Sequence, residues 1–363
     1  MEWKEITLGE IAIFKTGKLN SNAAISNGEY PFFTCSPETL RINNYAFDQE
    51  AILLAGNNAD GNFSIKYYKG KFNAYQRTYV ITPIRGKVDI KFLYYALSLC
   101  LKQFKNMSQG TSTKFLTVTI LNSFSVQLPS ISDQHRIASI LSSLDRKIEL
   151  NNKINADLEE MAQAIFKNWF VDFEPFKDGK FVDSELGMIP EGWKVGCLGD
   201  IAEITSGKRP PKKSKDKTKE LFIPLIGASD IMGFTSDVLY ERPILVIGRV
   251  GTHGVVQRFQ EKCWPSDNTL VIESSYYNYV YQLLKGIDYS AINRGSTQPL
   301  ITQTDVKNTD VIIAPENVLK EYESITSTLF SKHRANIKEN SRLSTLRDTL
   351  LPRLMSGELE VPE

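Results

Sequence analysis

The sequence predicts an α+β fold in which two β-rich globular domains, related by a pseudo-two-fold axis, are separated by a long antiparallel coiled coil of two helices. Three observations support this prediction. A long helical pattern occupies the middle of the chain, a second one lies near its end, and an internal repeat places a globular stretch before each. The content of 42% apolar and 23% charged residues is that of ordinary globular protein.

The first helical pattern runs from Asp133 to Phe170 without any Gly or Pro. Its apolar side chains recur in alternating steps of four and three, which is typical of a coiled-coil seam. At 1.5 Å per residue this helix would be about 57 Å long, so it needs a partner to cover its seam. Asn151 and Asn155 are polar seam positions of the kind that determine register. The predicted seam consists of Ile137, Leu141, Leu144, Ile148, Asn151, Asn155, Leu158 and Ile165.

The chain repeats itself at an offset of about 190 residues. WKEITLGEIAIFKTGK, from Trp3 to Lys18, and WKVGCLGDIAEITSGK, from Trp193 to Lys208, are identical at eight of sixteen positions. Three further segment pairs follow in the same order: residues 51–61 with 243–254, 78–81 with 269–272, and 109–121 with 294–306. Matches of four unlike segments in one order indicate an internal duplication.

The duplication identifies the partner helix as roughly Glu316 to Met355. Its predicted seam is Ile325, Leu329, Asn336, Leu343, Leu346 and Leu350. The predicted organisation is a first domain at 1–130, a first long helix at 131–170, a connector at 171–192, a second domain at 193–314 and a second long helix at 315–357. Val/Ile/Tyr/Phe runs between Gly/Asn/Pro turns predict strands in both domains, with shorter helices at 90–106 and 276–287.

No catalytic residue and no metal site is predicted. The sequence contains no HExxH, no P-loop and no GxSxG motif, and only three histidines. Gly248, Gly251 and Gly254 follow a strand without GxGxxG spacing, so we interpret them as a structural turn. The four cysteines stand alone, as in a reduced cytosolic protein, and no segment approaches a membrane span. We therefore expect a cytoplasmic protein that holds no cofactor of its own.

Positive charge is concentrated in predicted loops. The segment GKRPPKKSKDKTK, from Gly207 to Lys219, contains seven basic residues and one acid, and Pro210 and Pro211 exclude a helix. Such loops bind phosphate backbones through counterion release, although a solvated charge run would look the same. From this segment the predicted DNA contacts are Lys208, Arg209, Lys212 and Lys213.

Basic, aromatic and amide side chains elsewhere in both domains extend this prediction. In the first domain they are Lys18, Lys66, Tyr67, Lys69, Lys71, Gln76, Arg77, Gln109, Thr111, Ser112 and Lys114. In the second domain they are Arg249, His253, Arg258, Arg294, Ser296, Thr297 and Gln298. Amide and hydroxyl groups in small turns contact phosphates or base edges. A half-buried hairpin or ordinary turn chemistry explains the same patterns equally well.

Five stretches carry a resemblance to a known family. They are LGEI at Leu8–Ile11, LGDI at Leu198–Ile201, LPSISDQHRIASILSSLDRKIELNNKIN, EEMAQAIFKNWFVDF and SELGMIPEGWKVGCLGDI. In these stretches, and in its order of domain, helix, domain and helix, the whole chain resembles the specificity subunit of type I restriction–modification systems. The second long helix lacks the acid-Gln-x-x-Ile pattern that the first has at Asp133–Ile137.

The resemblance implies two target-recognition domains, each reading one half of a bipartite double-stranded DNA site. It implies that the coiled coil sets the spacer and docks two modification (methyltransferase) subunits, through which restriction subunits join. S-adenosylmethionine, ATP and Mg²⁺ would bind those partners, and no membrane is involved. We expect Ala162, Phe166 and Trp169 to face a docked methyltransferase as well as the partner helix. Two alternatives remain: a self-contained restriction or modification enzyme with an unrecognised motif, and a structural coiled-coil adaptor.

Overall fold

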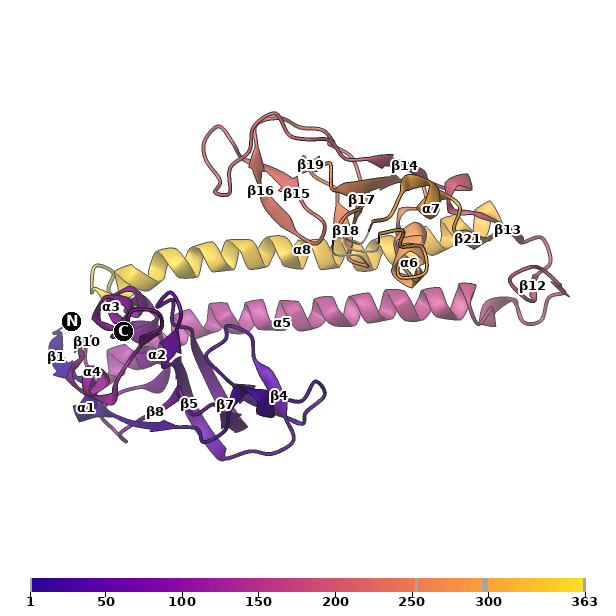
Figure 1. The fold of residues 1–363 in the computed structure, drawn as a ribbon. Helices are drawn as coiled ribbons and strands as arrows, with labels where there is room; N and C mark the ends of the chain where they lie inside the picture. The colour runs from indigo at the N-terminus through magenta and orange to yellow at the C-terminus, as the bar shows by residue number, and fades with distance from the viewer. Residues whose placement is uncertain (1, 252–253, 296–299, 362–363) are drawn as a thin grey trace. The chain divides into compact units, whose positions relative to one another are not determined.

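The computed structural model describes residues 2–251, 254–295 and 300–361 (Figure 1). The predicted contacts His253, Ser296, Thr297 and Gln298 lie outside these ranges. The chain forms two compact units. Unit 1 comprises Met1–Asn151 and Ile337–Glu363, and unit 2 comprises Asn152–Asn336. No helix in the described ranges is both long and apolar enough to cross a bilayer.

The two long helices are α5 (Ile131–Phe170) and α8 (Glu316–Met355), which confirms both helical patterns predicted from the sequence. Each helix contributes one half to each unit. The absence of Gly and Pro from α5 lets the backbone hydrogen bonds continue over 40 residues. The only proline of α8, Pro352, lies in its last turn. The predicted fold class of two β-rich domains with a long coiled coil is confirmed.

Unit 1 is built around a six-stranded sheet of order β2-β8-β5-β7-β3-β4. Its central strand β5 is buried on both faces, with Ile52 and Leu54 in one apolar cluster and Leu53 in another. The strands are β1 (Lys4–Thr7), β2 (Ala12–Thr16), β3 (Tyr30–Phe33), β4 (Leu40–Ile42), β5 (Phe47–Ala55), β6 (Asn57–Asn58), β7 (Ile65–Ala74), β8 (Thr78–Pro83), β9 (Lys114–Phe115) and β10 (Ser125–Leu128). The short helices are α1 (Leu8–Ile11), η1 (Ser21–Ala23), α2 (Ile90–Leu99), α3 (Leu101–Met107) and α4 (Val118–Ser123).

Unit 2 contains a four-stranded sheet of order β14-β20-β17-β18 and a three-stranded sheet of order β16-β15-β19. The strands are β11 (Phe181–Val182), β12 (Ile189–Pro190), β13 (Lys194–Cys197), β14 (Glu203–Ser206), β15 (Ile223–Ile226), β16 (Ile231–Thr235), β17 (Ile244–Gly248), β18 (Val256–Phe259), β19 (Trp264–Pro265), β20 (Thr269–Glu273) and β21 (Asp310–Ile313). The short helices are η2 (Glu174–Phe176), η3 (Leu198–Asp200), α6 (Tyr277–Gly286) and α7 (Gln303–Lys307).

In both units α5 and α8 run antiparallel, and buried polar groups lie between them. In unit 1 the amide of Asn151 donates to Glu339 Oε2 and to Asn340 Oδ1, each at 2.9 Å. In unit 2 Asn336 Nδ2 donates to Asn155 Oδ1 at 2.9 Å. A shift of one helix along the other would leave these amides buried without partners, which costs about 1–3 kcal/mol for each group. The amides therefore specify the register, as a polar seam residue does in other coiled coils.

The predicted seam of α8 is wrong at two positions. Ile325 is 39% exposed and Leu346 is 47% exposed. Their neighbours Thr326, which is fully buried, and Arg347, which pairs with Asp145, take the seam positions instead. A seam inferred from apolar residues misses positions that polar side chains occupy. Of the other predicted seam residues, Ile137, Leu141, Asn151, Asn155 and Asn336 are buried, whereas Leu144, Ile148, Leu158, Ile165, Leu329, Leu343 and Leu350 are half-buried.

The expectation that Ala162 faces a docked methyltransferase is contradicted, because this residue belongs to the core of unit 2. Ala162 is fully buried. Phe166 and Trp169 are half-buried and contact Tyr322 of α8, as expected for residues that face the partner helix. Phe166 and Trp169 join an aromatic cluster that we define as Phe166, Trp169, Phe170, Trp193, Tyr279 and Tyr322. Within it the ring centroids of Phe170 and Tyr279 are 4.6 Å apart.

Candidate nucleic-acid interface

In unit 1, four loops meet at one place and are joined by backbone hydrogen bonds. They are 17–20 after β2, 56–57 after β5, 75–77 before β8 and 109–116 before α4. The Gln76 amide donates to Leu19 O at 2.9 Å and the Gly56 amide to Arg77 O at 2.8 Å. The Leu116 amide donates to Gly56 O at 2.8 Å. We call this arrangement the four-loop junction of unit 1.

Unit 2 contains the equivalent junction, built from described residues 207–219, 249–251, 265–268 and 300–301. The Lys208 amide donates to Pro265 O at 3.0 Å and the Arg249 amide to Asn268 O at 2.8 Å. The Ile301 amide donates to Arg249 O at 2.9 Å. The bonds from the second loop to the third and from the fourth loop to the second are thus the same in both repeats, whereas the bond between the first and third loops has its donor on opposite loops. Loops carried by a rigid scaffold are the usual place for recognition residues.

A glycine at the start of each junction is required by close backbone approach. A Cβ atom at Gly17 would lie 1.7 Å from Ala74 O, and one at Gly207 would lie 2.1 Å from Ser266 O. Any other residue would push the first loop away from the third. Both glycines belong to the repeated Gly-Lys pair that the sequence shows at residues 17–18 and 207–208.

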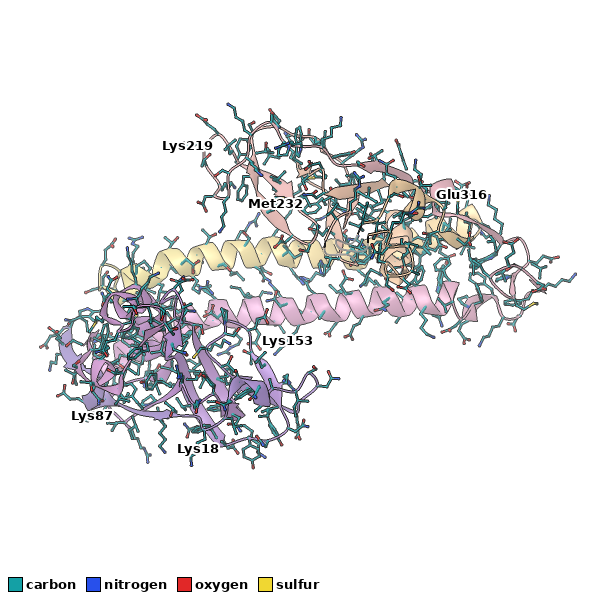
Figure 2. All side chains as sticks on the ribbon, viewed as in Figure 1. Lys18, Lys87, Lys153, Lys219, Met232 and Glu316 are labelled. Carbon is teal, nitrogen blue, oxygen red and sulfur yellow. The ribbon has the colours of Figure 1, made fainter. Side chains whose placement is uncertain are left out.

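The junction of unit 1 presents a mixture of cations and amides. Lys18, labelled in Figure 2, is exposed. Arg77 is also exposed, and Gln76 Nε2 donates to Asn20 Oδ1 at 2.7 Å. A hollow of about 380 Å³ beside them is lined by Asn57, Gln76, Arg77 and Phe115 among others. Of the other predicted contacts in this loop group, Gln109, Thr111 and Ser112 are exposed and Lys114 is half-buried. Amide, guanidinium and aromatic groups together suit base edges and phosphates.

The junction of unit 2 is more basic. No helix interrupts residues 207–219, and Lys208, Arg209, Lys212 and Lys213 are exposed. We call residues 207–219 the basic loop; Lys219, on this loop, is marked in Figure 2. A hollow of about 500 Å³ is lined by Arg209, Lys212, Lys213, Met232, Ser266 and Asn268, together with four other residues. Arg249 is half-buried at the same junction.

Two predicted contacts of unit 1 are engaged inside the protein. Lys66 Nζ donates to Ser36 O at 3.1 Å and to Glu38 O at 2.9 Å, and burial lowers its pKa. The Tyr67 hydroxyl donates to Glu50, so it also has an internal partner. On the same strand, β7, Lys69 and Lys71 are exposed, and Lys71 Nζ lies 4.7 Å from the centre of the Tyr45 ring. The alternating bases and aromatics of β7 are therefore partly structural.

The prediction of Arg258 as a DNA contact is contradicted by its position. Its guanidinium lies 3.6 Å from the centre of the Phe330 ring and 4.5 Å from that of Tyr281. Nη2 donates to Asn278 Oδ1 at 2.6 Å, and burial lowers the arginine pKa. Arg258 thus packs β18 against α6 and α8. Arg294 remains exposed but is paired with Asp305, which also caps α7 through Thr302.

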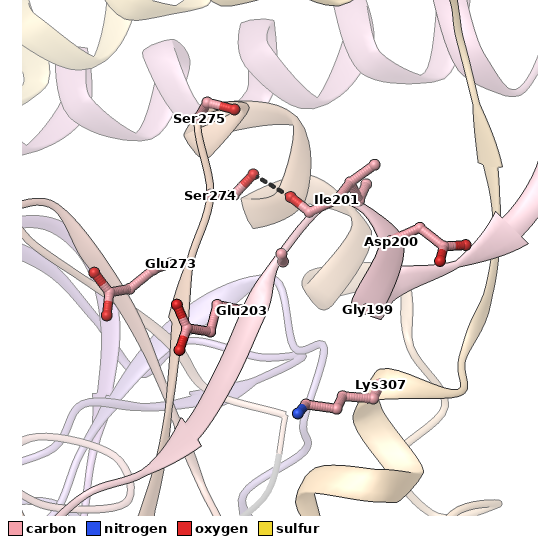
Figure 3. A pocket seen from close by; sticks show the side chains of 9 residues that line it. Gly199, Asp200, Ile201, Glu203, Glu273, Ser274, Ser275 and Lys307 are labelled. Atoms are coloured by element: carbon pink, nitrogen blue, oxygen red, sulfur yellow. Dashed lines mark hydrogen bonds between the residues drawn. The ribbon is translucent and has the colours of Figure 1, made fainter.

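A separate hollow of about 480 Å³ in unit 2 has the wrong charge for nucleic acid. It is lined by Asp200, Glu203, Glu273 and Lys307, as Figure 3 shows. The backbone hydrogen bond from Cys197 lowers the pKa of Asp200, and Glu273 pairs with Arg242. Three carboxylates against one lysine would repel phosphates. Within the described residues no group of three His, Cys, Asp or Glu side chains could hold a metal ion.

Sequence reasoning missed Asn57 and Asn268, which lie in the junctions. Asn57 Oδ1 accepts a hydrogen bond from Cys35 Sγ at 2.8 Å, and Asn268 lines the hollow beside the basic loop. The signal that could have identified them is the repeat itself, because Asn57 lies within the repeated segment 51–61 and Asn268 directly precedes the repeated segment 269–272.

Comparison with known proteins agrees with this architecture. The model of the type I restriction modification DNA specificity domain matches the chain twice, at residues 1–160 and 190–342. The chain is 38% identical over 232 residues to the type I restriction enzyme EcoDI specificity subunit of Escherichia coli; the match covers 58% of this chain but only 51% of that relative. It is 33% identical over 313 residues to the MjaIX specificity subunit of Methanocaldococcus jannaschii, covering 78% and 72% of the two chains.

A solved structure shares the fold. The crystal structure of the type I restriction–modification system S subunit from M. genitalium superimposes with a TM-score of 0.67 at 17% identity, over 97% of this chain and 96% of that one. The two matches of the family model coincide with the two repeats found in the sequence. The chain therefore belongs to the family of type I restriction modification DNA specificity proteins.

Proposed function

We propose that this chain is the non-catalytic DNA-specificity subunit of a type I restriction–modification complex. Each four-loop junction binds one half of a bipartite double-stranded DNA target, and the α5–α8 coiled coil sets the spacer. Residues 1–130 and 193–314 are the two recognition domains, 131–170 and 315–357 are the long helical regions, and 171–192 is the connector. The observation that carries the proposal is the same hydrogen-bonded loop junction in both repeats.

The charges of the junctions support DNA as the ligand. The exposed lysines of the basic loop suit a phosphate backbone. Gln76, Arg77 and Asn268 belong to the residue types that form hydrogen bonds with base edges. Two similar binding units in one chain suit a target made of two parts, since half-site spacing mirrors protein geometry.

The chemistry of the complex would belong to its other subunits. Relatives carry the name of type I restriction enzyme specificity subunits, which supports partnership with methyltransferase and restriction subunits. We propose that two methyltransferase subunits dock on the coiled coil and that restriction subunits join through them, in the cytoplasm. S-adenosylmethionine, ATP and Mg²⁺ bind those subunits under this proposal.

Equilibrium binding by the purified chain tests the proposal. We expect it to retain a duplex with both half-sites at least tenfold more tightly than a shuffled duplex, with affinity falling as salt rises. Given that duplex, Mg²⁺ and S-adenosylmethionine, it should neither cleave nor methylate. Equal retention of both duplexes would favour a structural adaptor, and cleavage or methylation by the chain alone would identify an enzyme.

A further inference from the structure

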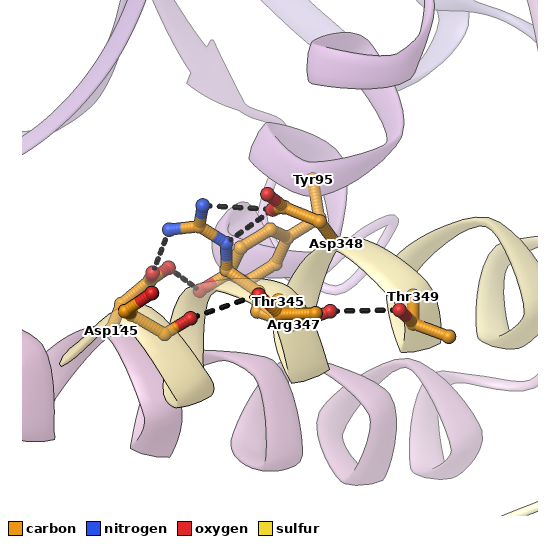
Figure 4. A network of polar contacts seen from close by, with 7 residues as sticks. Tyr95, Asp145, Thr345, Arg347, Asp348 and Thr349 are labelled. Carbon is orange, nitrogen blue, oxygen red and sulfur yellow. Dashed lines mark hydrogen bonds and ion pairs between the residues drawn. The ribbon is translucent and has the colours of Figure 1, made fainter. Parts of the chain in front are cut away.

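The short helix α2 of unit 1 is attached to both long helices through one carboxylate. The Tyr95 hydroxyl donates to Asp145 Oδ2 of α5 at 2.5 Å, and Arg347 Nη1 of α8 donates to Asp145 Oδ1 at 2.7 Å (Figure 4). Arg347 is further held by Asp348 at 2.8 Å. We call Tyr95, Asp145 and Arg347 the α2 anchor. Hydrogen bonds to charged groups are about twice as strong as neutral ones.

The start of α2 is attached to α5 at a second point. Asp89 caps α2 by accepting from the Phe92 amide at 2.8 Å, and its Oδ2 lies 2.9 Å from His135 Nδ1. The Asp89 amide donates to Gln134 Oε1 at 3.0 Å. A helix attached at one point can pivot, whereas attachment at Asp89 and at Tyr95 sets the direction of its axis on α5.

The equivalent helix of unit 2, α6, is likewise attached to α5 through a tyrosine and a carboxylate. The Tyr281 hydroxyl donates to Glu159 Oε2 of α5 at 3.1 Å. Glu159 also lies 3.4 Å from Lys285 Nζ and 4.0 Å from His333 Nε2 of α8. We call Tyr281, Glu159 and His333 the α6 anchor. At the start of α6 the Asn278 and Tyr279 amides each donate to Glu323 Oε1 of α8 at 2.8 Å.

The two anchors use different residues at different helix positions. Both long helices have 40 residues, and α8 begins and ends 185 residues after α5. At that offset Phe330 corresponds to Asp145, so the acceptor of unit 1 has no carboxylate counterpart in α8. Unit 2 instead supplies its carboxylate from α5, at Glu159. The tyrosine–carboxylate contact is thus present in both units although its residues have changed, which indicates that the contact itself has a role.

We propose that the α2 and α6 anchors hold each recognition domain at a set angle on the long helices and thereby determine which spacer length the chain accepts. This inference rests on the proposed function. Adding one base pair to a spacer moves a half-site by about 3.4 Å along the duplex. A domain free to pivot on its helices would follow that movement, and an anchored domain would not. Tyr95 and Tyr281 are therefore positioning residues that need not touch DNA.

The test compares Tyr95→Phe and Tyr281→Phe, which keep the rings and remove only the anchoring hydroxyls. The matched control is Tyr277→Phe, because Tyr277 is on α6 but its hydroxyl donates to Ile244 O of the domain's own sheet at 3.2 Å. Dissociation constants are measured for duplexes with the native spacer, with one added base pair, and with a single half-site. The half-sites are taken from methylated motifs of the source genome.

Discrimination is the ratio of the dissociation constants for the longer and the native spacer. We expect this ratio to fall about tenfold in each anchor variant, because about tenfold corresponds to the loss of one charge-assisted hydrogen bond. Single half-site affinity and the control should change less than twofold. Unchanged discrimination with intact half-site binding would overturn the anchor proposal and leave the proposed function standing. If the wild-type chain bound two half-sites no better than one, the proposed function itself would fail.

A second pair of variants is used if a phenylalanine variant does not fold. If either phenylalanine variant unfolds below the assay temperature, Asp145→Asn and Glu159→Gln replace it, because an amide oxygen still accepts from tyrosine. Their discrimination should fall less than that of a folded phenylalanine variant and more than that of Tyr277→Phe. Wild-type discrimination in both amide variants would also overturn the proposal.

Discussion

The triple variant Lys212→Gln, Lys213→Gln and Lys215→Gln should bind every duplex more weakly, on the order of a hundredfold at low salt. All three lysines are exposed on the basic loop, and none forms an ion pair with another described residue. Their charge is therefore available for phosphates. The slope of log K against log[salt] should become shallower by about 3, close to one unit for each lost phosphate contact.

A control variant removes the same charge elsewhere in unit 2. Lys180→Gln, Lys194→Gln and Lys332→Gln lie outside the basic loop, and their lysines are also exposed. This control should change affinity by less than about threefold if the effect depends on place rather than on net charge. Filter-binding or fluorescence-anisotropy titrations at four salt concentrations provide both quantities. A changed sequence preference in the loop variant, at an unchanged salt slope, would show that these lysines read bases instead of phosphates.

Phe170→Ala should destabilise unit 2 by about 3–5 kcal/mol, the usual cost of removing a buried phenylalanine. Phe170 is 4% exposed and lies at the centre of the aromatic cluster. Its ring centroid is 5.0 Å from that of Tyr322 on α8 and 5.7 Å from that of Trp193, which directly follows the connector. The substitution leaves a cavity where α5, α6 and α8 meet, and the neighbouring rings can fill it only partly.

Denaturant unfolding monitored by tryptophan fluorescence measures this loss, because Trp169 and Trp193 are in the cluster. Met161→Ala is the control on the same helix, since Met161 is 51% exposed. It should change the free energy of unfolding by no more than about 0.5 kcal/mol. A cost below 1 kcal/mol for Phe170→Ala would mean that the cluster does not hold these elements together.

The long helices could be predicted closely from the sequence, whereas the α8 seam could not. Uninterrupted heptad patterning defines a helix whatever it packs against, so α5 and α8 have nearly the expected bounds. The seam prediction failed at Ile325 and Leu346 because buried Thr326 and half-buried Arg347 take the seam positions. Whether a polar side chain is buried depends on a partner on the other helix, and heptad patterning in one helix does not identify that partner.

The place of the candidate site could also be predicted, because the repeated segments end in the loops that form both junctions. The roles of individual lysine and arginine side chains could not be predicted. Lys66 and Arg258 have the same charge as Lys18 and Lys212, yet carbonyl groups hold the first and aromatic rings surround the second. Such contacts involve residues 28 and 72 positions away in the sequence, so periodicity and composition do not reveal them.

Under the proposed function, one chain recognises a DNA target in two separate parts. Single-molecule sequencing of modified bases in the source genome tests it most directly, with a strain lacking this gene as the reference. We predict a methylated motif that disappears in that strain and consists of two defined blocks separated by a constant number of unspecified bases. A motif of one continuous block, or an unchanged methylation pattern in the deletion strain, would contradict the account.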